Sequence, residues 1–455
     1  MLLTILFGVL GFGIMVFVHE LGHFWAAKRL GIQVEAFSLG WGPRLAGFTR
    51  HGTDYRLSAI PFGGYCKMKG EASLVPARQE PQEFKPEPGS FLAAAPWKRI
   101  VLAASGPVAN ALFAVLVLTA IWWIGFRSYS DDNRIVLASD YTLDRFPAPP
   151  PATRAGLRTG DRVLEIDGAQ VRSFQDILQI VSSSPETTLT FTVERQGRRL
   201  VVPVEAELDR ASGSGRIGVY SWREPVIERV EAGSAAAAAG LAPGDRLLAA
   251  DGTPIAHIID LFQILAAKPS VLRLRVQRGS AELERTLVVP YSPEGAPQLG
   301  LSFEVQSYRS PRLGPAGALV KGLEETWSTI ALTVRGFGLL FRGVSLRSAV
   351  AGPLRITYYV GSVASSGFSQ GVSQGLVSYF RFLCLLSIVL FLMNLLPIPG
   401  LDGGQVLVFL IEIVRRRPTS PRIIARIQAI SFSLLILVAV AVTANDILFF
   451  LGRQR

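Results

Sequence analysis

The stretch from Phe12 to Ala27 reads FGIMVFVHELGHFWAA and decides how the rest of the chain is interpreted. It is apolar apart from His19, Glu20 and His23, and it is part of a longer apolar run from Leu2 to Ala27. About 20 apolar residues in a helix are enough to cross the hydrocarbon core of a bilayer. Ionisable residues within such a helix are costly in free energy and usually serve a function. We therefore predict a membrane span that contains a polar site.

The composition agrees with a membrane protein. Of the 455 residues, 49% are hydrophobic and only 18% are charged, against about 25% charged residues in typical soluble proteins. These values exclude a disordered chain and disfavour a purely soluble multidomain protein. The first apolar run lacks a basic leader and a small-residue cleavage site, so we do not expect a cleaved signal peptide. Three further runs could also span a bilayer: Ile100–Phe126, Leu376–Leu396 and Ile427–Leu451.

The distribution of Lys and Arg predicts the orientation of these four spans. The segments 28–99 and 415–426 are basic, and short basic loops stay in the cytoplasm. The N-terminus, the segment 127–375 and the C-terminus then lie outside the cytoplasm. Topology thus accounts for much of the net charge of +11. The chain has no basic domain interleaved with aromatic residues, so we expect the lipid bilayer and no nucleic acid as a partner.

The long segment between the second and third runs contains an internal repeat. Residues 155–164, AGLRTGDRVL, recur 84 residues later as 239–248, AGLAPGDRLL, and Asp167-Gly168 recurs as Asp251-Gly252. Each copy continues with a short helical stretch and then alternating strands. The signature resembles that of bacterial PDZ domains, which predicts a tandem pair of α+β domains outside the membrane. A generic β-rich duplication is the alternative.

The motif His19-Glu20-Leu21-Gly22-His23 predicts a metal site. Residues i and i+4 share one face of a helix, so both imidazoles can reach one ion while Glu20 lies beside it. This H-E-x-x-H arrangement is typical of zinc hydrolases, in which the Glu activates the metal-bound water. The alternative is a chance match, but the chain has only four His residues.

Two His residues leave a catalytic zinc without its third protein ligand. The stretch 394–404, NLLPIPGLDGG, supplies a carboxylate in Asp402 just after the third run, where Pro and Gly interrupt the helix. Such backbone is tolerated within a membrane only where protein surrounds it. An interfacial turn whose Asp caps the next helix is the alternative. With four spans, Asp402 and the two His residues share the cytoplasmic half of the membrane. A fifth span over 316–341 would separate them, so we expect that segment to be an amphipathic helix outside the membrane or at its surface.

Together these motifs resemble the site-2 protease family of intramembrane zinc metalloproteases. They are HELGH in the first span, GPVAN at 106–110 in the second, NxxPxPxLDGG in the third, and the paired PDZ signatures. The likeness covers essentially the full length, including YCKM at 65–68 and AGPL at 351–354, and is closest to the regulator-of-sigma-E-protease branch.

The resemblance implies one zinc per chain, held by His19, His23 and Asp402, with Glu20 as the general base. It implies cleavage within the membrane of a single-pass protein that a site-1 protease has already trimmed, such as an anti-sigma factor. It also implies a multi-pass protein of the bacterial inner membrane, with both termini and the PDZ domains in the periplasm.

Accessory substrate contacts are also expected. The alternation of residues 55–60, broken at 61–65, predicts a β-hairpin, and the resemblance implies a membrane-associated β-loop that holds the substrate extended. An ordinary cytoplasmic hairpin is the alternative. The expected substrate-binding residues are Asn394, Pro397, Pro399, Gly63 and Gly64, although Asn394 is also suited to joining helices. At the head of the second repeat, a candidate PDZ peptide-binding loop comprises Ile217, Gly218 and Val219.

The expected fold is a polytopic α-helical membrane protein with four spans, a membrane-associated β-hairpin and two inserted PDZ domains. The predicted boundaries are 1–30 (first span), 31–97 (β-loop and flexible cytoplasmic loop), 98–127 (second span), 128–210 and 211–295 (PDZ domains), 296–375 (extracytoplasmic amphipathic segment), 376–404 (third span), 405–426 (cytoplasmic basic loop) and 427–455 (fourth span).

Two other functions are compatible with parts of the sequence. A membrane-anchored PDZ adaptor with a vestigial metal site would explain the repeats, but it would not need the base Glu20. A membrane zinc protease of the prenyl-protein-processing kind would explain the HELGH motif. The PDZ signatures and an Asp rather than a Glu as third ligand disfavour that class.

Overall fold

The computed structural model describes residues 2–70, 87–91, 93–141, 148–210, 213–293, 295–340, 351–417, 419 and 421–452. The flexible loop predicted over 74–89 lies largely outside these residues. The described residues form two compact units. The helical unit comprises the described parts of Met1–Phe126, Ser310–Gly338 and Leu346–Gln454, and the repeat unit comprises those of Arg127–Arg309.

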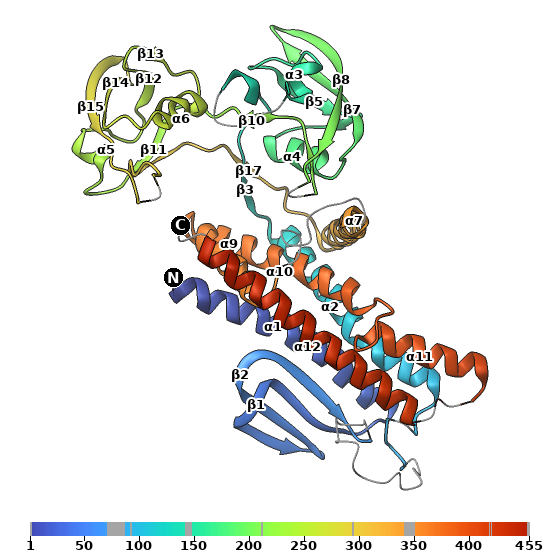
Figure 1. The fold of residues 1–455 in the computed structure, drawn as a ribbon. Coiled ribbons are helices and arrows are strands. Elements are labelled where there is room, and N and C mark those ends of the chain that lie inside the picture. The colour runs from blue at the N-terminus through green and yellow to red at the C-terminus, as the bar shows by residue number, and fades with distance from the viewer. Residues whose placement is uncertain are drawn as a thin grey trace. The chain divides into compact units, whose positions relative to one another are not determined.

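Long apolar helices form the frame of the helical unit (Figure 1). Four of the described helices are long and apolar enough to cross a membrane, and each coincides with a predicted span. They are α1 (Leu2–Leu30), α2 (Pro96–Ile124), α10 (Val372–Asn394) and α12 (Pro421–Gly452). The four predicted spans are therefore confirmed as helices of suitable length and composition.

Three more helices belong to this unit, and one of them corrects a prediction. They are α7 (Pro315–Leu340), α9 (Pro353–Ser369) and α11 (Asp402–Arg415). The segment 405–426 was expected to be a basic loop, but α11 occupies its first part. The reason is that residues 405–414, QVLVFLIEIV, carry apolar side chains at helical spacing before the Arg residues begin. Helix α7 matches the predicted amphipathic helix.

Small residues bring the helices of this unit close together. Helix α1 packs against α2 and α9, and α10 packs against the same two helices. A Cβ atom at Gly8 of α1 would lie 2.2 Å from the carbonyl oxygen of Thr357 in α9, so only Gly permits that approach. Packing of this kind is the main source of attraction between helices in lipid.

A buried ion pair joins α11 to α2. Arg99 of α2 donates from Nη2 to Oε2 of Glu412 at 2.6 Å, and the two side chains are only 5% and 2% exposed. The same guanidinium lies over the Phe409 ring, 4.6 Å from its centre. The backbone N–H of Thr419 donates to the second Glu412 oxygen at 3.0 Å. These contacts fix α11, and hence its first residue, against α2.

Two strands follow α1 and pack against it. Strand β1 (Val34–Arg50) pairs antiparallel with β2 (Thr53–Met68), and the turn between them is His51-Gly52, both with positive φ. The turn between the strands is thus not at the predicted break of 61–65, but β2 does fold back on itself there. Its residues 54–57 pair with 36–39 of β1 in the same direction, and its residues 64–67 pair with them in the opposite direction. Residue Ala36 pairs with both Asp54 and Lys67, so the first half of β1 lies between the two halves of β2. The second half of β2 is consequently an edge of the sheet.

The sequence repeat is also a repeat in three dimensions. The first copy has the sheet order β6-β5-β7-β8-β9, and the second copy has the matching order β13-β12-β14-β15. Two helices per copy pack beside the sheet, a short one, α3 (Pro151–Arg154) or α5 (Ala235–Ala238), and a longer one, α4 (Phe174–Ser182) or α6 (Ile258–Ala266). The strands are β5 (Arg162–Ile166), β6 (Ala169–Gln170), β7 (Thr187–Arg195), β8 (Arg198–Leu208), β9 (Gly215–Arg216), β12 (Arg246–Ala250), β13 (Thr253–Pro254), β14 (Val271–Arg278) and β15 (Ala281–Val288).

The Asp of each Gly-Asp signature has the same structural role in both copies. Arg195 donates to both carboxylate oxygens of Asp161 at 2.7 and 2.6 Å. Arg278 does the same for Asp245 at 2.6 and 2.8 Å. This hydrogen-bonded guanidinium holds the pKa of Asp245 below its usual range. The Gly-Asp pair thus recurs in both copies because its buried carboxylate is hydrogen-bonded to an Arg on a strand, which holds the Gly-Asp loop against that strand.

The first repeat extends beyond its predicted boundary at 210. Ile217 is 2% exposed and lies in the first repeat's hydrophobic core, and its carbonyl oxygen accepts from the Ala152 N–H at 2.9 Å. The strand that follows, β10 (Val219–Ser221), pairs with β4 (Ile135–Leu137). The prediction that residues 217–219 begin the second repeat is therefore wrong. They form the end of the first repeat, because the last strand of each copy lies well beyond the Ala-Gly-Leu signature by which the copy is recognised.

The second repeat has its own counterpart of this closing segment, which the sequence analysis missed. The Ala236 N–H donates to the Leu299 carbonyl oxygen at 3.0 Å. Gly300 has φ of 69°, as Gly218 has φ of 78° in the first repeat. Strand β16 (Leu301–Phe303) then pairs with β11 (Ile227–Val230). The segment 299–301 thus occupies in the second repeat the place of 217–219 in the first.

Candidate metal centre

Helix α1 brings the two His residues of the HELGH motif together, as their spacing predicts. The Nε2 atoms of His19 and His23 lie 3.2 Å apart, and the ring centres lie 4.8 Å apart. Both side chains are mostly buried, at 14% and 11% exposed. Two imidazole nitrogens that face each other at this distance form one half of a metal site.

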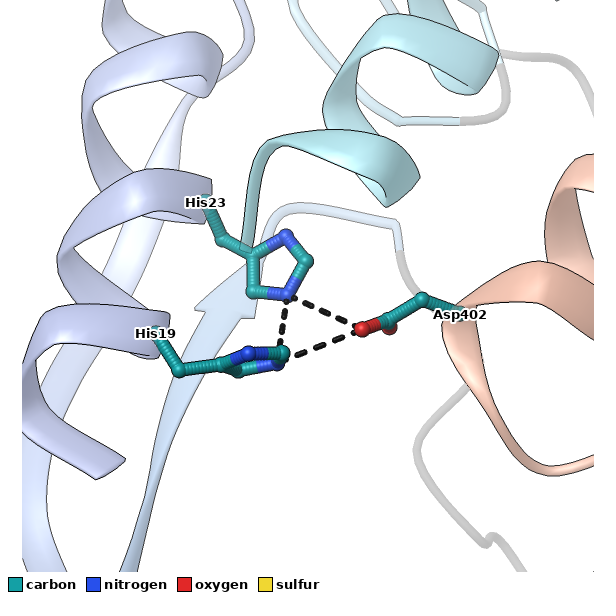
Figure 2. A group of neighbouring side chains, drawn as sticks. All are labelled: His19, His23 and Asp402. Carbon is teal, nitrogen blue, oxygen red and sulfur yellow. Dashed lines mark hydrogen bonds and ion pairs between the residues drawn. The ribbon is translucent and has the colours of Figure 1, made fainter. Parts of the chain in front are cut away.

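Asp402 supplies the other half from the first turn of α11. Its Oδ2 lies 3.2 Å from Nε2 of His19 and 3.7 Å from Nε2 of His23 (Figure 2). The helix α10 ends at Asn394, and α11 begins at Asp402 after an interruption that contains Pro397 and Pro399. The predicted convergence of His19, His23 and Asp402 is therefore present in the structure.

Two glycines after Asp402 allow the first turn of α11 to pack closely against the segment that connects it to α10. A Cβ atom at Gly403 would lie 2.3 Å from the Leu395 carbonyl oxygen. At Gly404 it would lie 2.3 Å from that of Ile398. Any larger residue would push α11 away from this backbone and would move Asp402 with it. The LDGG sequence is thus explained by close packing as well as by its carboxylate.

The three side chains fit a zinc ion. Their ligand atoms all lie within 4.8 Å of one another, and no other group of this kind occurs among the described residues. Tetrahedral coordination with bonds of about 2.0–2.1 Å separates the ligand atoms by roughly 3.4 Å. The observed separations of 3.2, 3.2 and 3.7 Å agree with that spacing. Two imidazoles and one carboxylate also leave a fourth position free, as catalytic zinc sites do.

The far side of each imidazole contacts α2. Nδ1 of His23 lies 2.9 Å from the carbonyl oxygen of Leu102, which fixes Nε2 as the nitrogen that faces the centre. Nδ1 of His19 lies 3.3 Å from the side-chain amide of Asn110. Helix α2 can approach this closely because Gly106 has no side chain. A Cβ atom there would lie 2.3 Å from Nε2 of His23.

Glu20 lies beside the three ligands and against β2. The backbone N–H of Cys66 hydrogen-bonds to its carboxylate. A Cβ atom at Gly64 would lie 3.4 Å from Cγ of Glu20, in ordinary contact. The edge half of β2 therefore runs next to the predicted base. Gly63, one residue earlier, has φ of 96° and lies under the Trp41 indole.

An apolar cavity with a volume of about 320 Å³ lies between α1 and the sheet. Phe17 of α1 lines it, together with residues of β1 and of the first half of β2. Its lining also includes Phe37, Leu39 and Leu57. Such a cavity is suited to apolar side chains.

The remaining predicted site residues differ in their accessibility. Pro397 and Pro399 are exposed and Asn394 is half-buried, on the segment that leads into Asp402. Ile217 is buried in a core, and a Cβ atom at Gly218 would lie 2.3 Å from Pro150. The structure thus leaves the first group open to a ligand and encloses the second within the repeat.

The sequence analysis missed the contribution of α2 to the centre. Gly106 and Asn110 were noted only as part of the GPVAN motif. Their spacing of four residues, on a helix that also carries Leu102, was the available signal. It could not be interpreted without knowing which helix packs against the His residues.

Comparison with known proteins gives a consistent result. The family model described as Peptidase family M50 matches residues 7–438. A putative zinc metalloprotease of Treponema pallidum is 38% identical over 451 residues, which is 98% of this chain and 99% of that protein. The regulator of sigma-E protease RseP of Escherichia coli is 29% identical over 459 residues, covering 96% of this chain and 97% of that protein.

A solved PDZ domain also matches part of the chain. It comes from an SdrC-like protein of Listeria monocytogenes, is 20% identical, and covers 21% of this chain and 90% of that domain. The TM-score is 0.16, which is too low to bear on the fold.

Proposed function

The chain belongs to peptidase family M50, the site-2 metalloproteases, and from this premise we propose that it cleaves single-pass membrane proteins within their membrane-spanning segments. The observation that carries the proposal is that Asp402 converges with His19 and His23 beside Glu20, on a helix, α1, that could span a membrane. A membrane-anchored adaptor would need neither this convergence nor an adjacent base.

In the proposed mechanism, His19, His23 and Asp402 hold one zinc per chain. When bound, the zinc supplies Lewis acidity that polarises a peptide carbonyl and acidifies water. The Glu20 carboxylate accepts a proton from the attacking water and passes it to the departing amide nitrogen. The hydrogen bond from the Cys66 N–H keeps that carboxylate in place during both transfers.

The edge half of β2 is proposed to hold the substrate in an extended form. A membrane helix has its backbone groups paired internally, so it must unwind before a peptide bond becomes accessible. Residues 64–67 pair with the first half of β1 and form the outermost strand of this sheet. A substrate strand added at this edge would run past Glu20. Gly63, Gly64, Asn394, Pro397 and Pro399 are the proposed contacts.

The proposed orientation follows from the basic loops. The segment 28–99 and the residues after α11 are assigned to the cytoplasm, which puts the active site in the cytoplasmic half of a bacterial inner membrane. Both termini and the repeat unit are then periplasmic. This arrangement rests on the Lys and Arg distribution and on four crossings by α1, α2, α10 and α12.

The repeat unit is proposed to be a tandem of PDZ domains that controls access of substrates. The substrate would be of the anti-sigma-factor type, shortened outside the membrane by a site-1 protease. Gly218 is unsuitable for testing peptide capture, because any side chain there would collide with Pro150 and disturb the repeat itself. A deletion is a better test. Strand β3 (Arg127–Tyr129) pairs with β17 (Ser307–Arg309), so the two ends of the repeat unit lie side by side and a short linker can join them.

The experiment compares wild type, Glu20→Gln and a chain in which a Gly-Ser linker replaces residues 131–305. Each is reconstituted in liposomes with a single-pass substrate carrying either a short or a bulky ectodomain. We expect wild type to cleave only the short form, Glu20→Gln to cleave neither, and the deletion to cleave both. Cleavage by Glu20→Gln would contradict the proposed chemistry. Loss of short-substrate cleavage in the deletion, with zinc still bound, would contradict the gating role.

A further inference from the structure

We propose that Asn110 of α2 is a positioning residue of the metal centre and that its side-chain oxygen accepts a hydrogen bond from Nδ1–H of His19. The proposal rests on the zinc site of the proposed function. It assigns a role in metal binding to a residue that is not itself a ligand.

Asn110 is placed for this role by burial and by its position on α2. Its side chain is 0% exposed, and its amide lies 3.3 Å from Nδ1 of His19. Its backbone carbonyl oxygen, on the other side, accepts from the Ser387 hydroxyl of α10 at 3.1 Å. The backbone of α2 thus faces α10 at this residue, while the side chain is directed at a candidate ligand on α1.

The protonation of His19 determines which amide atom must face it. Nε2 of His19 points at Asp402 and at the other imidazole, so it needs a free lone pair to bind a metal. A neutral imidazole then carries its proton on Nδ1, which becomes a donor. An amide NH₂ group is also a donor and cannot accept that proton. The amide oxygen can.

The other amide atom does not distinguish the two orientations. With Nδ2 towards His19, the buried Oδ1 has no hydrogen-bond partner among the described residues, and in the rotated amide Nδ2 takes that place. The contact with His19 therefore decides the orientation. Rotation of the amide by about 180° exchanges two atoms of almost equal size and brings Oδ1 to Nδ1 of His19. That orientation pairs a donor with an acceptor at the contact with His19.

The two His ligands are thus supported in different ways. His23 donates from Nδ1 to the Leu102 carbonyl oxygen, which no side-chain substitution removes. His19 depends on one side chain, which substitution can remove. A hydrogen bond of this kind fixes the tautomer and the ring orientation and makes Nε2 a stronger donor to the metal. Substitution of Asn110 should therefore lower zinc affinity far more than substitution of other residues that pack around His19.

The test uses the full-length protein in detergent and four forms of it: wild type, Asn110→Leu, Asn110→Asp and Ser387→Ala. Asn110→Leu removes the acceptor at similar volume, and Asn110→Asp supplies a carboxylate acceptor in the same place. Ser387→Ala is the control, because it disturbs the packing around Asn110 without touching its side chain. The readouts are the zinc dissociation constant, from competition with a chromogenic chelator, and the visible spectrum after loading with cobalt.

We expect Asn110→Leu to bind zinc about 10- to 100-fold more weakly than wild type and to shift the cobalt bands. Asn110→Asp and Ser387→Ala should remain near wild type in affinity. Equal affinity of Asn110→Leu and wild type would overturn the inference while leaving the zinc site intact. So would equal weakening by Asn110→Asp, which would indicate a packing effect. Absence of zinc binding in wild type would overturn the proposed function as well. Should Asn110→Leu fail to fold, Asn110→Ala replaces it with the same expected outcomes.

Discussion

Gly106 offers a sharp test of how closely α2 must approach the metal centre. Substitution by Ala adds one methyl group that would lie 2.3 Å from Nε2 and 2.7 Å from Cε1 of His23, and 2.8 Å from Cε1 of His19. Cβ atoms essentially never lie within 3.0 Å of a non-bonded heavy atom, and ordinary contact begins at 3.4 Å. The imidazole of His23 must therefore move by about 1 Å, or the two helices must separate by a similar distance.

A displacement of about 1 Å at a reacting centre lowers the rate by roughly 10²-fold. We therefore expect Gly106→Ala to lose about 10²-fold in kcat/KM and to bind zinc more weakly. The change should not unfold α2, because Ala is intrinsically favoured over Gly within a helix by about 1 kcal/mol. Loss of function without loss of helix is the expected pattern.

The assay measures cleavage of the short single-pass substrate, zinc affinity and the thermal melting of the same preparations. Gly13→Ala is the matched control, because it makes the same change inside α1 with no atom within 4 Å of the added methyl group. Gly13→Ala should behave like wild type in all three measurements. Gly106→Ala with wild-type activity would show that α2 does not press on the His residues, and it would refute the packing described for the centre.

Three further outcomes are expected. Glu412→Ala leaves the guanidinium of α2 buried and unpaired, so the helical unit should lose about 3–5 kcal/mol of stability, measured by thermal melting. The lowered pKa of Asp245 means that its pairing with Arg278 stabilises the repeat above the ordinary carboxyl pKa and is lost as pH falls through the lowered value. Arg278→Ala should therefore destabilise the repeat near neutral pH and flatten the acid dependence, seen by hydrogen exchange of β12 and β14; an unchanged acid dependence would contradict this pairing. Single Cys residues at Thr419 and Ser280 should be labelled from opposite sides of the membrane, and labelling from one side would overturn the four-span orientation.

The convergence of His19, His23 and Asp402 was predictable because the three residues lie in motifs with strong local constraints. His19 and His23 are one helical turn apart, and Asp402 follows a Pro- and Gly-containing break at the end of an apolar run. Topology alone then placed them in the same half of the membrane. Asn110 and Gly106 were beyond reach, because their role depends on the packing of α2 against α1, which no local pattern encodes.

The misplaced boundaries have a different cause. The segment of α11 was expected to be a loop because the prediction relied on the Arg residues at its end and disregarded the helical spacing of the apolar residues before them. The turn of the β1–β2 pair was placed at the Pro and Gly residues of 61–65, where β2 folds back on itself, whereas His51-Gly52 makes the turn between the two strands. Residues 217–219 were assigned to the wrong repeat, since the last strand of each copy follows a stretch without a recognisable signature. For α11 the missed signal was thus local, whereas for 61–65 and 217–219 the pairing of strands distant in the sequence decided the structure.

The central claim is that His19, His23 and Asp402 form one zinc site that serves Glu20, and the zinc content of three purified proteins tests it most directly. Wild type, Asp402→Ala and Glu20→Gln are compared by elemental analysis under identical conditions, and each is assayed for cleavage of the short substrate. We expect about one zinc per chain in wild type and in Glu20→Gln, and little or none in Asp402→Ala. Only wild type should cleave. Undiminished zinc in Asp402→Ala would contradict the ligand assignment, and cleavage by Glu20→Gln would contradict the assignment of the base.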